Sequence, residues 1–242
     1  MSSYLLIVAA GGYATRALPL TGYGAKMKSL INVGAGGVTV IEEILREARD
    51  SGIEHGVIIT SSEENVSVFR RYLDPLGEDP AFAEYLERRD KAPEKQVIAD
   101  RGMLSRVDLV VQTEPRGFGD AISLAEPHLA EGGSSGAVIA LGDDVVHAST
   151  PAARQLMTAH TLTASMVVAV QRVSREDASR YGVILVDAQP LKLGAEFVGK
   201  AAYRALGMEE KPAEPTPNVI DGEDVYFAVV GRYLIRPEDM AF

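Results

Sequence analysis

A glycine-rich segment near the N-terminus carries residue types that bind phosphate. Ala10, Gly11 and Gly12 directly follow an apolar run, and Arg16 comes four residues later. Glycines let backbone N–H groups approach phosphate oxygens closely because no Cβ intervenes, and an arginine can hold a phosphate with forked hydrogen bonds. The segment is neither G-x-x-x-x-G-K-[ST] nor an intact G-x-G-x-x-G, which disfavours P-loop and dinucleotide sites. Alone, it also fits a tight turn without a ligand.

The distribution of charge indicates an anionic ligand at this end of the chain. The 242 residues carry 24 Lys and Arg against 34 Asp and Glu, a net charge of −10. Residues 1–41 nevertheless contain no acidic residue and three cations, Arg16, Lys26 and Lys28. A second candidate segment, Gly142-Asp143-Asp144, follows another apolar run, and its carboxylates fit either a ligand site or a capped turn.

The order of apolar runs predicts the elements that position these residues. Strands are expected at residues 4–9, 56–60, 107–112 and 136–141, and helices at about 38–50, 63–73, 118–129 and 150–161. This alternation is typical of a parallel sheet covered on both faces by helices. Ligands bind such sheets beyond the carboxyl ends of the strands, which is where Gly11 and Asp143 fall.

The second half of the chain is expected to be rich in strands. These are predicted at residues 165–173, 182–186, 203–208 and 225–235, with loops at 187–202 and 212–224. The charged segment 78–106 is expected to form one or two exposed helices. We therefore predict one α/β domain over residues 1–242, with a Rossmann-like, mixed, mainly parallel sheet flanked by helices.

Composition excludes several classes of function. The chain has no cysteine, which rules out disulfides, thiolate metal sites and a cysteine nucleophile. No apolar run approaches the ~18 residues that a membrane span needs, and an isoelectric point near 5.0 disfavours a general nucleic-acid binder. We expect a cytoplasmic protein that binds neither membrane nor nucleic acid. The four histidines match no metal-ligand spacing and are interpreted as structural; they are His55, His128, His147 and His160.

Several segments resemble sugar-1-phosphate nucleotidylyltransferases. AGGYATR and the following LPLT, from Ala10 to Thr21, resemble the signature A-G-G-x-G-T-R-x-x-P-x-T, with Ala14 in place of a glycine. Further matches narrow the resemblance to bacterial UTP–glucose-1-phosphate uridylyltransferases; they are KSLINV from Lys28, QTEPRGFGDA from Gln112, LGDD from Leu141, SRYGVI from Ser179, EKP from Glu210 and AVVGRY from Ala228. Ser29 and Asp120 replace the usual Glu and His of the family.

The resemblance implies roles at the matching positions. Ala10, Gly11 and Gly12 would line a nucleotide pocket, and Gln112 and Gly117 would contact uracil. Arg16 and Lys28 would neutralise the triphosphate and the departing pyrophosphate, and Asp143 would bind both the nucleotide and Mg²⁺. In the sugar-phosphate site, Gly182, Glu210 and Lys211 would hold the second substrate. Residues 1–150 would form the nucleotide half of a nucleotide-diphospho-sugar transferase fold, and residues 151–242 a C-terminally shortened sugar-phosphate half.

The implied reaction converts UTP and glucose 1-phosphate into UDP-glucose and pyrophosphate. The resemblance also implies a homo-oligomer. The family continues for several tens of residues beyond the position of Ile235, with a late Asp that completes the metal site, whereas this chain ends at Phe242. Two alternatives therefore remain open. The chain would use another pair of substrates, such as dTTP with a hexose 1-phosphate, or it would be a shortened homologue that binds nucleotide or sugar nucleotide without turnover.

Overall fold

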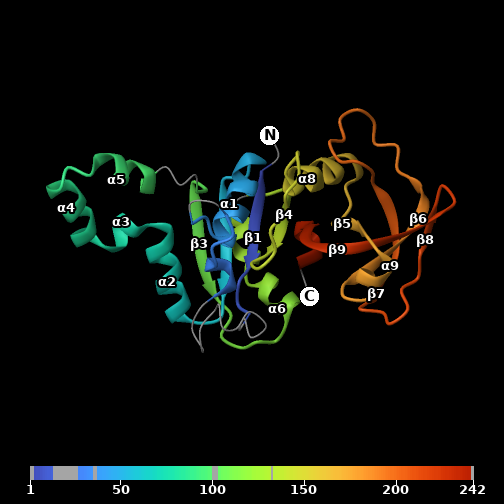
Figure 1. The fold of residues 1–242 in the computed structure, drawn as a ribbon, viewed down its shortest axis with the longest axis horizontal. Coiled ribbons are helices and arrows are strands. Elements are labelled where there is room, and N and C mark those ends of the chain that lie inside the picture. The colour runs from blue at the N-terminus through green and yellow to red at the C-terminus, as the bar shows by residue number, and fades with distance from the viewer. Residues whose placement is uncertain (1–2, 13–26, 35–36, 100–102, 132, 241–242) are drawn as a thin grey trace. The chain divides into compact units, whose positions relative to one another are not determined.

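The computed structural model describes residues 3–12, 27–34, 37–99, 103–131 and 133–240, without the side chains of Val97 and Ala99. The chain folds into two compact units. Unit 1 comprises residues 1–145 together with 237–242, and unit 2 comprises residues 146–236. Figure 1 shows the helices and strands of each unit.

Unit 1 is built on four parallel strands. In spatial order they are β3 (Arg106–Val111), β2 (His55–Thr60), β1 (Tyr4–Ala9) and β4 (Gly136–Leu141). Leu5, Leu6, Ile7 and Val8 of β1 are at most 1% exposed. A strand buried on both faces is typical of a parallel sheet with covering helices, because both sets of alternating side chains meet apolar partners.

Two well-capped helices follow β1 and β2. Helix α1 (Val40–Asp50) begins at Thr39, whose hydroxyl accepts the Glu42 N–H, and helix α2 (Glu63–Leu73) begins at Ser62. Such caps satisfy N–H groups that have no partner within the helix. The remaining elements of unit 1 are η2 (Lys28–Leu30), α3 (Pro75–Glu78), α4 (Pro80–Arg88), α5 (Ala92–Ala99), α6 (Phe118–Ser123), α7 (Glu126–Glu131) and η3 (Pro237–Met240).

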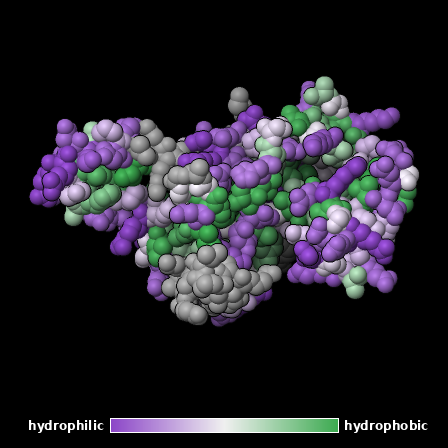
Figure 2. Space-filling model, in the orientation of Figure 1, coloured by the Kyte–Doolittle hydropathy of each residue, from purple (hydrophilic) through white to green (hydrophobic). Residues whose placement is uncertain are grey.

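Helices α4 and α5 fill most of the charged segment 78–106, and α3 ends where the segment begins. They are shown leading away from α2 in Figure 1, and Figure 2 shows mainly hydrophilic residues on them. Leu86 is the buried residue of α4. One or two exposed helices were expected here, and α4 and α5 confirm this. Pro80 and Pro93 each stand in the first turn of one of these helices, a position where proline is tolerated.

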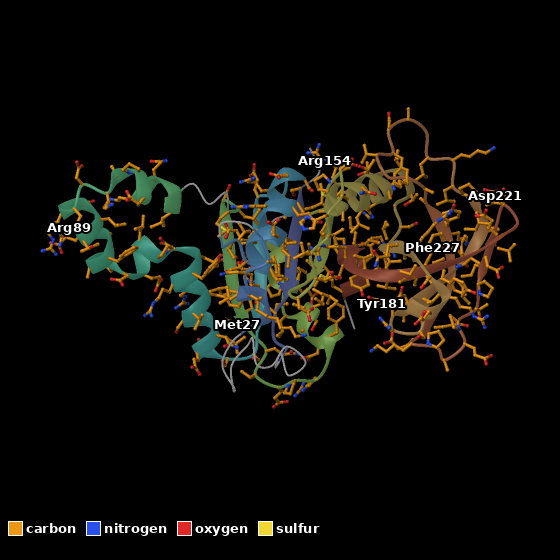
Figure 3. All side chains as sticks on the ribbon, in the orientation of Figure 1. Met27, Arg89, Arg154, Tyr181, Asp221 and Phe227 are labelled. Atoms are coloured by element: carbon orange, nitrogen blue, oxygen red, sulfur yellow. The ribbon has the colours of Figure 1, made fainter. Side chains whose placement is uncertain are left out.

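Unit 2 is an antiparallel sheet with two helices. Strand β9 (Glu223–Ile235) pairs with β5 (Val167–Val173), β6 (Gly182–Pro190) and β8 (Asn218–Ile220), and β6 also pairs with β7 (Tyr203–Glu210). Helix α8 (Ala152–Thr163) and the short α9 (Arg175–Ala178) contact β9. Ile184, Ile220, Val225 and Phe227 form a small apolar core, with Phe227 labelled in Figure 3.

The predicted α/β class, with a mixed sheet flanked by helices and a strand-rich second half, is confirmed. Three local predictions differ from the structure. The single helix expected at 118–129 is two helices because Pro127 lacks the N–H that would continue α6. The loops expected at 187–202 and 212–224 contain the end of β6 and all of β8. None of the described helices has the length and apolarity of a membrane span.

Candidate active site

Backbone hydrogen bonds tie the carboxyl ends of neighbouring parallel strands together in unit 1. The Ala10 N–H donates to the Ile59 carbonyl at 2.8 Å, and the Gln112 N–H donates to the Thr60 carbonyl at 2.8 Å. These bonds extend the ladders by one residue beyond β1 and β3. They bring Ala10 and Gln112, which are 102 positions apart, to the same edge of the sheet.

Gly142 brings the end of β4 against the end of β1. Its N–H donates to the Ala9 carbonyl at 2.9 Å. A Cβ built on Gly142 would lie 2.9 Å from that oxygen and 3.1 Å from the Ala10 Cα. Glycine permits this close approach, so Gly142 holds the end of β4, which the following Asp143 continues, against Ala9 and Ala10.

An ion pair joins two of the three charged residues that the sequence analysis assigned to the nucleotide site. Lys28 Nζ lies 2.7 Å from Asp143 Oδ2, and the side chains are 24% and 42% exposed. Lys28 belongs to η2, and Asp143 follows β4. Because both groups remain partly accessible, an anionic ligand can reach the ammonium and a cation can reach the carboxylate.

The segment carrying Lys28 is held by buried neighbours on either side. Met27 is 6% exposed, and the Thr60 hydroxyl contacts its sulfur at 4.0 Å (Met27 is labelled in Figure 3). Ser29 is 2% exposed, and within the described ranges its hydroxyl has no hydrogen-bond partner. The alternation of buried and accessible residues directs Lys28 outward while the backbone stays anchored at the end of β2.

The Gln112 side chain donates hydrogen bonds to the segment that follows it. Its Nε2 donates to the Gly117 carbonyl at 3.1 Å and to Asp120 Oδ2 at 2.6 Å. Gly117 has a φ of 117°, in the region that favours glycine. These two bonds commit the donor end of the amide and leave the acceptor Oε1 as the end suited to an external N–H donor.

In unit 2, strand register brings the three expected sugar-phosphate residues together. Gly182 begins β6 and lies opposite Glu210 at the end of β7. A Cβ on Gly182 would be 3.2 Å from Glu210 Oε2, so the carboxylate lies directly over this glycine. Lys211 Nζ is 3.3 Å from Glu210 Oε1, and the Lys211 N–H donates to the Tyr181 carbonyl at 3.1 Å (Tyr181 is labelled in Figure 3).

Lys211 has a strained backbone. Its φ is 45°, a left-handed conformation that a non-glycine residue adopts at a cost of roughly 1–3 kcal/mol. Such strain is found preferentially where a side chain must be held in a particular place. It supports a ligand-binding role for the exposed ammonium of Lys211.

The neighbouring Glu209 accepts hydrogen bonds within its own turn, unlike Glu210. The hydroxyl and the N–H of Thr216 both donate to the Glu209 carboxylate, at 2.7 and 3.0 Å. These hydrogen bonds stabilise the charged form and hold the pKa of Glu209 below its ordinary value. Glu209 thus closes the 209–216 turn and leaves Glu210 as the carboxylate beside Lys211.

Two clusters therefore contain most of the residues that the sequence singled out. Unit 1 holds Ala10, Gly11, Gly12, Lys28, Gln112, Gly117 and Asp143, and unit 2 holds Gly182, Glu210 and Lys211. Arg16 lies outside the described residues. Sequence reasoning missed the contacts of Asp120 and Tyr181. It noted Asp120 only as a replacement of histidine, and nothing local indicates that this carboxylate receives the Gln112 amide.

Comparison with known proteins gives a consistent result. A family model described as Nucleotidyl transferase matches residues 5–241. A UTP--glucose-1-phosphate uridylyltransferase of Bacillus subtilis (strain 168) is 30% identical over 233 residues, which are 96% of this chain and 70% of the relative. UTP-bound UGPase from Acinetobacter baumannii superposes with a TM-score of 0.77 at 22% identity, covering 98% of this chain and 76% of that one. A UDP-glucose pyrophosphorylase complexed with UDP-glucose gives a TM-score of 0.67 at 23% identity, covering 98% and 78%.

Proposed function

The chain belongs to the nucleotidyl transferase family, and on that premise we propose that it makes UDP-glucose and pyrophosphate from UTP and glucose 1-phosphate. The observation that carries the proposal is the Lys28–Asp143 pair at the carboxyl edge of the parallel sheet. This pair combines an ammonium that can bind phosphate with a carboxylate that can bind a metal ion. The named activity of the Bacillus relative and the UTP and UDP-glucose complexes of the similar structures support uridylyl transfer.

The chemistry requires positioning and charge neutralisation. A phosphate oxygen of glucose 1-phosphate attacks the α-phosphorus of UTP, the new O–P bond forms, and the bond to the pyrophosphate leaving group breaks in line. The attacking oxygen is already anionic, so a general base is not needed. The barrier comes from repulsion between two anions and from charge growing on the leaving group, which fixed cations and N–H donors stabilise.

In the nucleotide half, Lys28 and Arg16 face the phosphates in this proposal. Lys28 contributes a positive charge at a place fixed by Met27 and Ser29. The backbone from Ala10 to Gly12 offers N–H groups without side chains in the way. The carboxylate-free stretch of residues 1–41 suits this role because an acid there would repel the triphosphate.

Recognition of the base rests on Gln112 and Gly117. Uracil presents one ring N–H donor between two carbonyl acceptors. With its Nε2 held by Asp120, Gln112 can accept the ring N–H through Oε1. The Gly117 segment can offer its backbone to a neighbouring carbonyl of the base. This arrangement discriminates against cytosine, which lacks that N–H. Thymine has the same N–H, so the preference for UTP over dTTP comes from the family-like sequence segments and not from the Gln112 contact.

Nucleotidyl transferases generally use a divalent metal ion, and we propose Mg²⁺ held by Asp143. No described group of three potential ligands includes Asp143, so the protein would supply only a minority of the ligands. This fits Mg²⁺, which is usually bound by one or two carboxylates together with substrate phosphates and waters. When bound, the ion would supply Lewis-acid stabilisation of the phosphate charge. Before ligand binds, the contact with Lys28 holds the Asp143 carboxylate in position.

In the sugar-phosphate half, Lys211 and Glu210 bind different parts of the substrate in this proposal. Lys211 would pair with the phosphate of glucose 1-phosphate, and Glu210 would accept hydrogen bonds from sugar hydroxyls. Gly182 leaves the Glu210 carboxylate uncovered on one side. We propose that residues 151–242 form this sugar-phosphate half, that the enzyme acts in the cytoplasm, and that it assembles as a homo-oligomer, as the family resemblance implies.

A pyrophosphate-release assay across UTP, dTTP, ATP, CTP and GTP tests the proposal. Each nucleotide is offered with glucose 1-phosphate and Mg²⁺, and separately without the sugar phosphate. Release with UTP that depends on glucose 1-phosphate is expected. Preferential release with dTTP would assign the other nucleotide. No release, together with a higher melting temperature in UTP or UDP-glucose, would replace the enzyme by a binding protein.

A further inference from the structure

A cluster of three side chains that could ligate a metal ion lies toward the amino ends of β2 and β3 in unit 1. His55 begins β2, Asp108 is the third residue of β3, and His128 lies on α7. Each offers one ligand atom, and these three atoms all lie within 4.8 Å of one another. His55 and Asp108 are 53 residues apart, and His128 follows 20 residues later. No local spacing in the sequence predicts this cluster.

The distances within the cluster suit a metal ion. Asp108 Oδ2 lies 2.8 Å from His55 Nε2 and 3.0 Å from His128 Nδ1. Two ligand atoms bound at about 2.0–2.1 Å to a tetrahedral zinc ion are ~3.3 Å apart. Small rotations of the side chains would therefore open these two contacts to the separation that an ion requires, without a change in backbone register.

The donor set has the chemistry of a transition-metal site. Two imidazole nitrogens with one carboxylate form a set typical of Zn²⁺ and related divalent ions. Partial burial raises the pKa of Asp108, but hydrogen bonds from His55 and Arg106 outweigh it and hold that pKa below its ordinary value. The carboxylate is thus ionised and able to act as a ligand.

One buried nitrogen of the cluster has an ion-pair contact but no hydrogen bond to a described residue. His128 Nδ1 is buried, and it makes no hydrogen bond of acceptable geometry to any described residue despite lying 3.0 Å from the Asp108 carboxylate. An orphaned buried polar atom in a folded protein points to a missing ion or water. Within this cluster, an ion bound by His128, His55 and Asp108 would satisfy it.

A pocket of about 500 Å³ adjoins the cluster. Its lining includes Asp108 and His128, together with Arg70, Leu73 and Met103. A metal ion held by three protein atoms keeps an open position for water or another ligand, and the pocket supplies space for one. This site is separate from the nucleotide site, because Asp108 precedes Gln112 by four residues of extended chain, or ~13 Å along it.

Arg106 is the group that competes with an ion. Its guanidinium lies 2.7 Å from Asp108 Oδ2 and 3.8 Å from Glu131. The Arg106 side chain is 54% exposed, so it can move to Glu131 or to solvent. We propose that His55, Asp108 and His128 bind one divalent transition-metal ion of the Zn²⁺ type, with Arg106 turned away when the ion is bound.

Titration of the metal-free full-length chain with Zn²⁺ by calorimetry tests the proposal. The titration is done in the Asp143→Asn background as well as in the unchanged chain, so that an ion at the nucleotide site is not counted. One Zn²⁺ per chain is expected in Asp143→Asn, with micromolar or tighter affinity, and any additional Zn²⁺ bound by the unchanged chain is assigned to Asp143. Binding should weaken as pH falls from 7.5 to 5.5, because imidazoles must be unprotonated to bind a metal.

Substitution of the ligands locates the ion. His128→Ala and His55→Ala should each weaken Zn²⁺ binding by at least ~100-fold, more than the loss of an outer contact would cause. His147→Ala, at an exposed histidine outside the cluster, is the matched control and should bind Zn²⁺ as the unchanged chain does. Circular dichroism verifies that each variant is folded.

A spectroscopic measurement keeps the test independent of the variants. Co²⁺ in place of Zn²⁺ should give the visible absorption of a four- or five-coordinate nitrogen–oxygen site. Absence of one-to-one binding in Asp143→Asn, or equal affinity in His128→Ala, would overturn the proposal. None of these readouts depends on uridylyl transfer, so either proposal can fail without the other.

Discussion

At the scale of single residues, the pairing of Lys28 with Asp143 governs the candidate nucleotide site. Each group fixes the position of the other through a contact of 2.7 Å. Both remain partly exposed, so neither is committed to a closed structural ion pair. An ammonium so placed can exchange the carboxylate for a phosphate when the nucleotide binds, which keeps the cation in place without burying an unpaired charge.

Replacement of Lys28 by alanine should lower turnover by at least ~100-fold, because a fixed positive charge in the transition state is lost. The melting temperature should change little, since the lysine is partly exposed. Pyrophosphate release under saturating UTP and glucose 1-phosphate measures the effect. Lys192→Ala, at an exposed lysine of unit 2, is the control and should retain full activity. Turnover close to wild type in Lys28→Ala would contradict the role.

Replacement of Asp143 by asparagine should also lower turnover by at least ~100-fold, and it should raise the Mg²⁺ concentration needed for half-maximal activity. The shape of the side chain is preserved while its charge is lost. Activity measured over a range of Mg²⁺ concentrations tests this. Asp144→Asn, at the adjacent carboxylate, should have the smaller effect. A reversed order would assign the metal ion to Asp144 instead.

Replacement of Lys211 by alanine should raise the KM for glucose 1-phosphate more than the KM for UTP, because the ammonium lies beside Glu210 in the candidate sugar-phosphate cluster of unit 2. Steady-state kinetics with each substrate varied in turn separates the two constants. Lys200→Ala, at another exposed lysine of unit 2, serves as the control. Equal increases in both constants would argue against a specific contact with the sugar phosphate.

At the scale of elements, the carboxyl ends of the parallel strands form the platform for the nucleotide site. Apolar runs make these strands because residues buried on both faces need no alternation. The Ala10–Ile59 and Gln112–Thr60 bonds then hold the loops that follow. The position of each loop residue is therefore set by register rather than by its own side chain.

Replacement of Gly142 by alanine should destabilise the protein by roughly 1–3 kcal/mol, the usual cost of overpacking. The added Cβ would meet the Ala9 carbonyl oxygen at 2.9 Å, and backbone cannot yield as a flexible side chain would. Chemical denaturation measures the loss, and activity should fall with it because Asp143 moves. Gly207→Ala is the control, since a Cβ at that position would have no neighbouring atom within 4 Å. Equal stability of the two variants would refute the packing argument.

At the scale of the whole molecule, the two compact units hold different candidate sites. Unit 1 carries the residues expected to bind nucleotide, and unit 2 carries those expected to bind sugar phosphate. The parallel sheet of unit 1 has helix-covered strands, whereas unit 2 is an antiparallel sheet centred on β9. The chain spans 70% of the length of its Bacillus relative, and both candidate sites fall within the shared part.

Hydrogen exchange should resolve separate footprints for the two substrates. UTP with Mg²⁺ should slow exchange at Ala10–Gly12 and at Gln112–Gly117 in unit 1. Glucose 1-phosphate should slow exchange near Gly182 and Lys211 in unit 2. Mass spectrometry of peptides from the intact chain measures both, with adenosine and inorganic sulfate as control ligands. Protection by UTP confined to unit 2 would contradict the assignment of the nucleotide half.

Much of the fold could be predicted because the physical causes are local. Apolar runs such as Tyr4–Ala9 must be buried, and Ser62 follows a strand and caps the next helix with its own hydroxyl. Family-like segments also singled out Lys28, Asp143 and Lys211 as candidate site residues. The predicted helix boundaries were wrong where a single residue interrupts an element, as Pro127 does between α6 and α7.

The sequence by itself determined the order of elements, the buried strands and the kinds of chemistry available, because propensity, periodicity and residue type are properties of short segments. Only the tertiary structure decided which distant residues meet. Packing of η2 places Lys28 against Asp143, and strand register places Glu210 over Gly182. Packing of α7 beside β2 and β3 brings His55, Asp108 and His128 together, although the sequence had indicated four structural histidines. Contacts across tens of residues depend on register and packing, which no local pattern encodes.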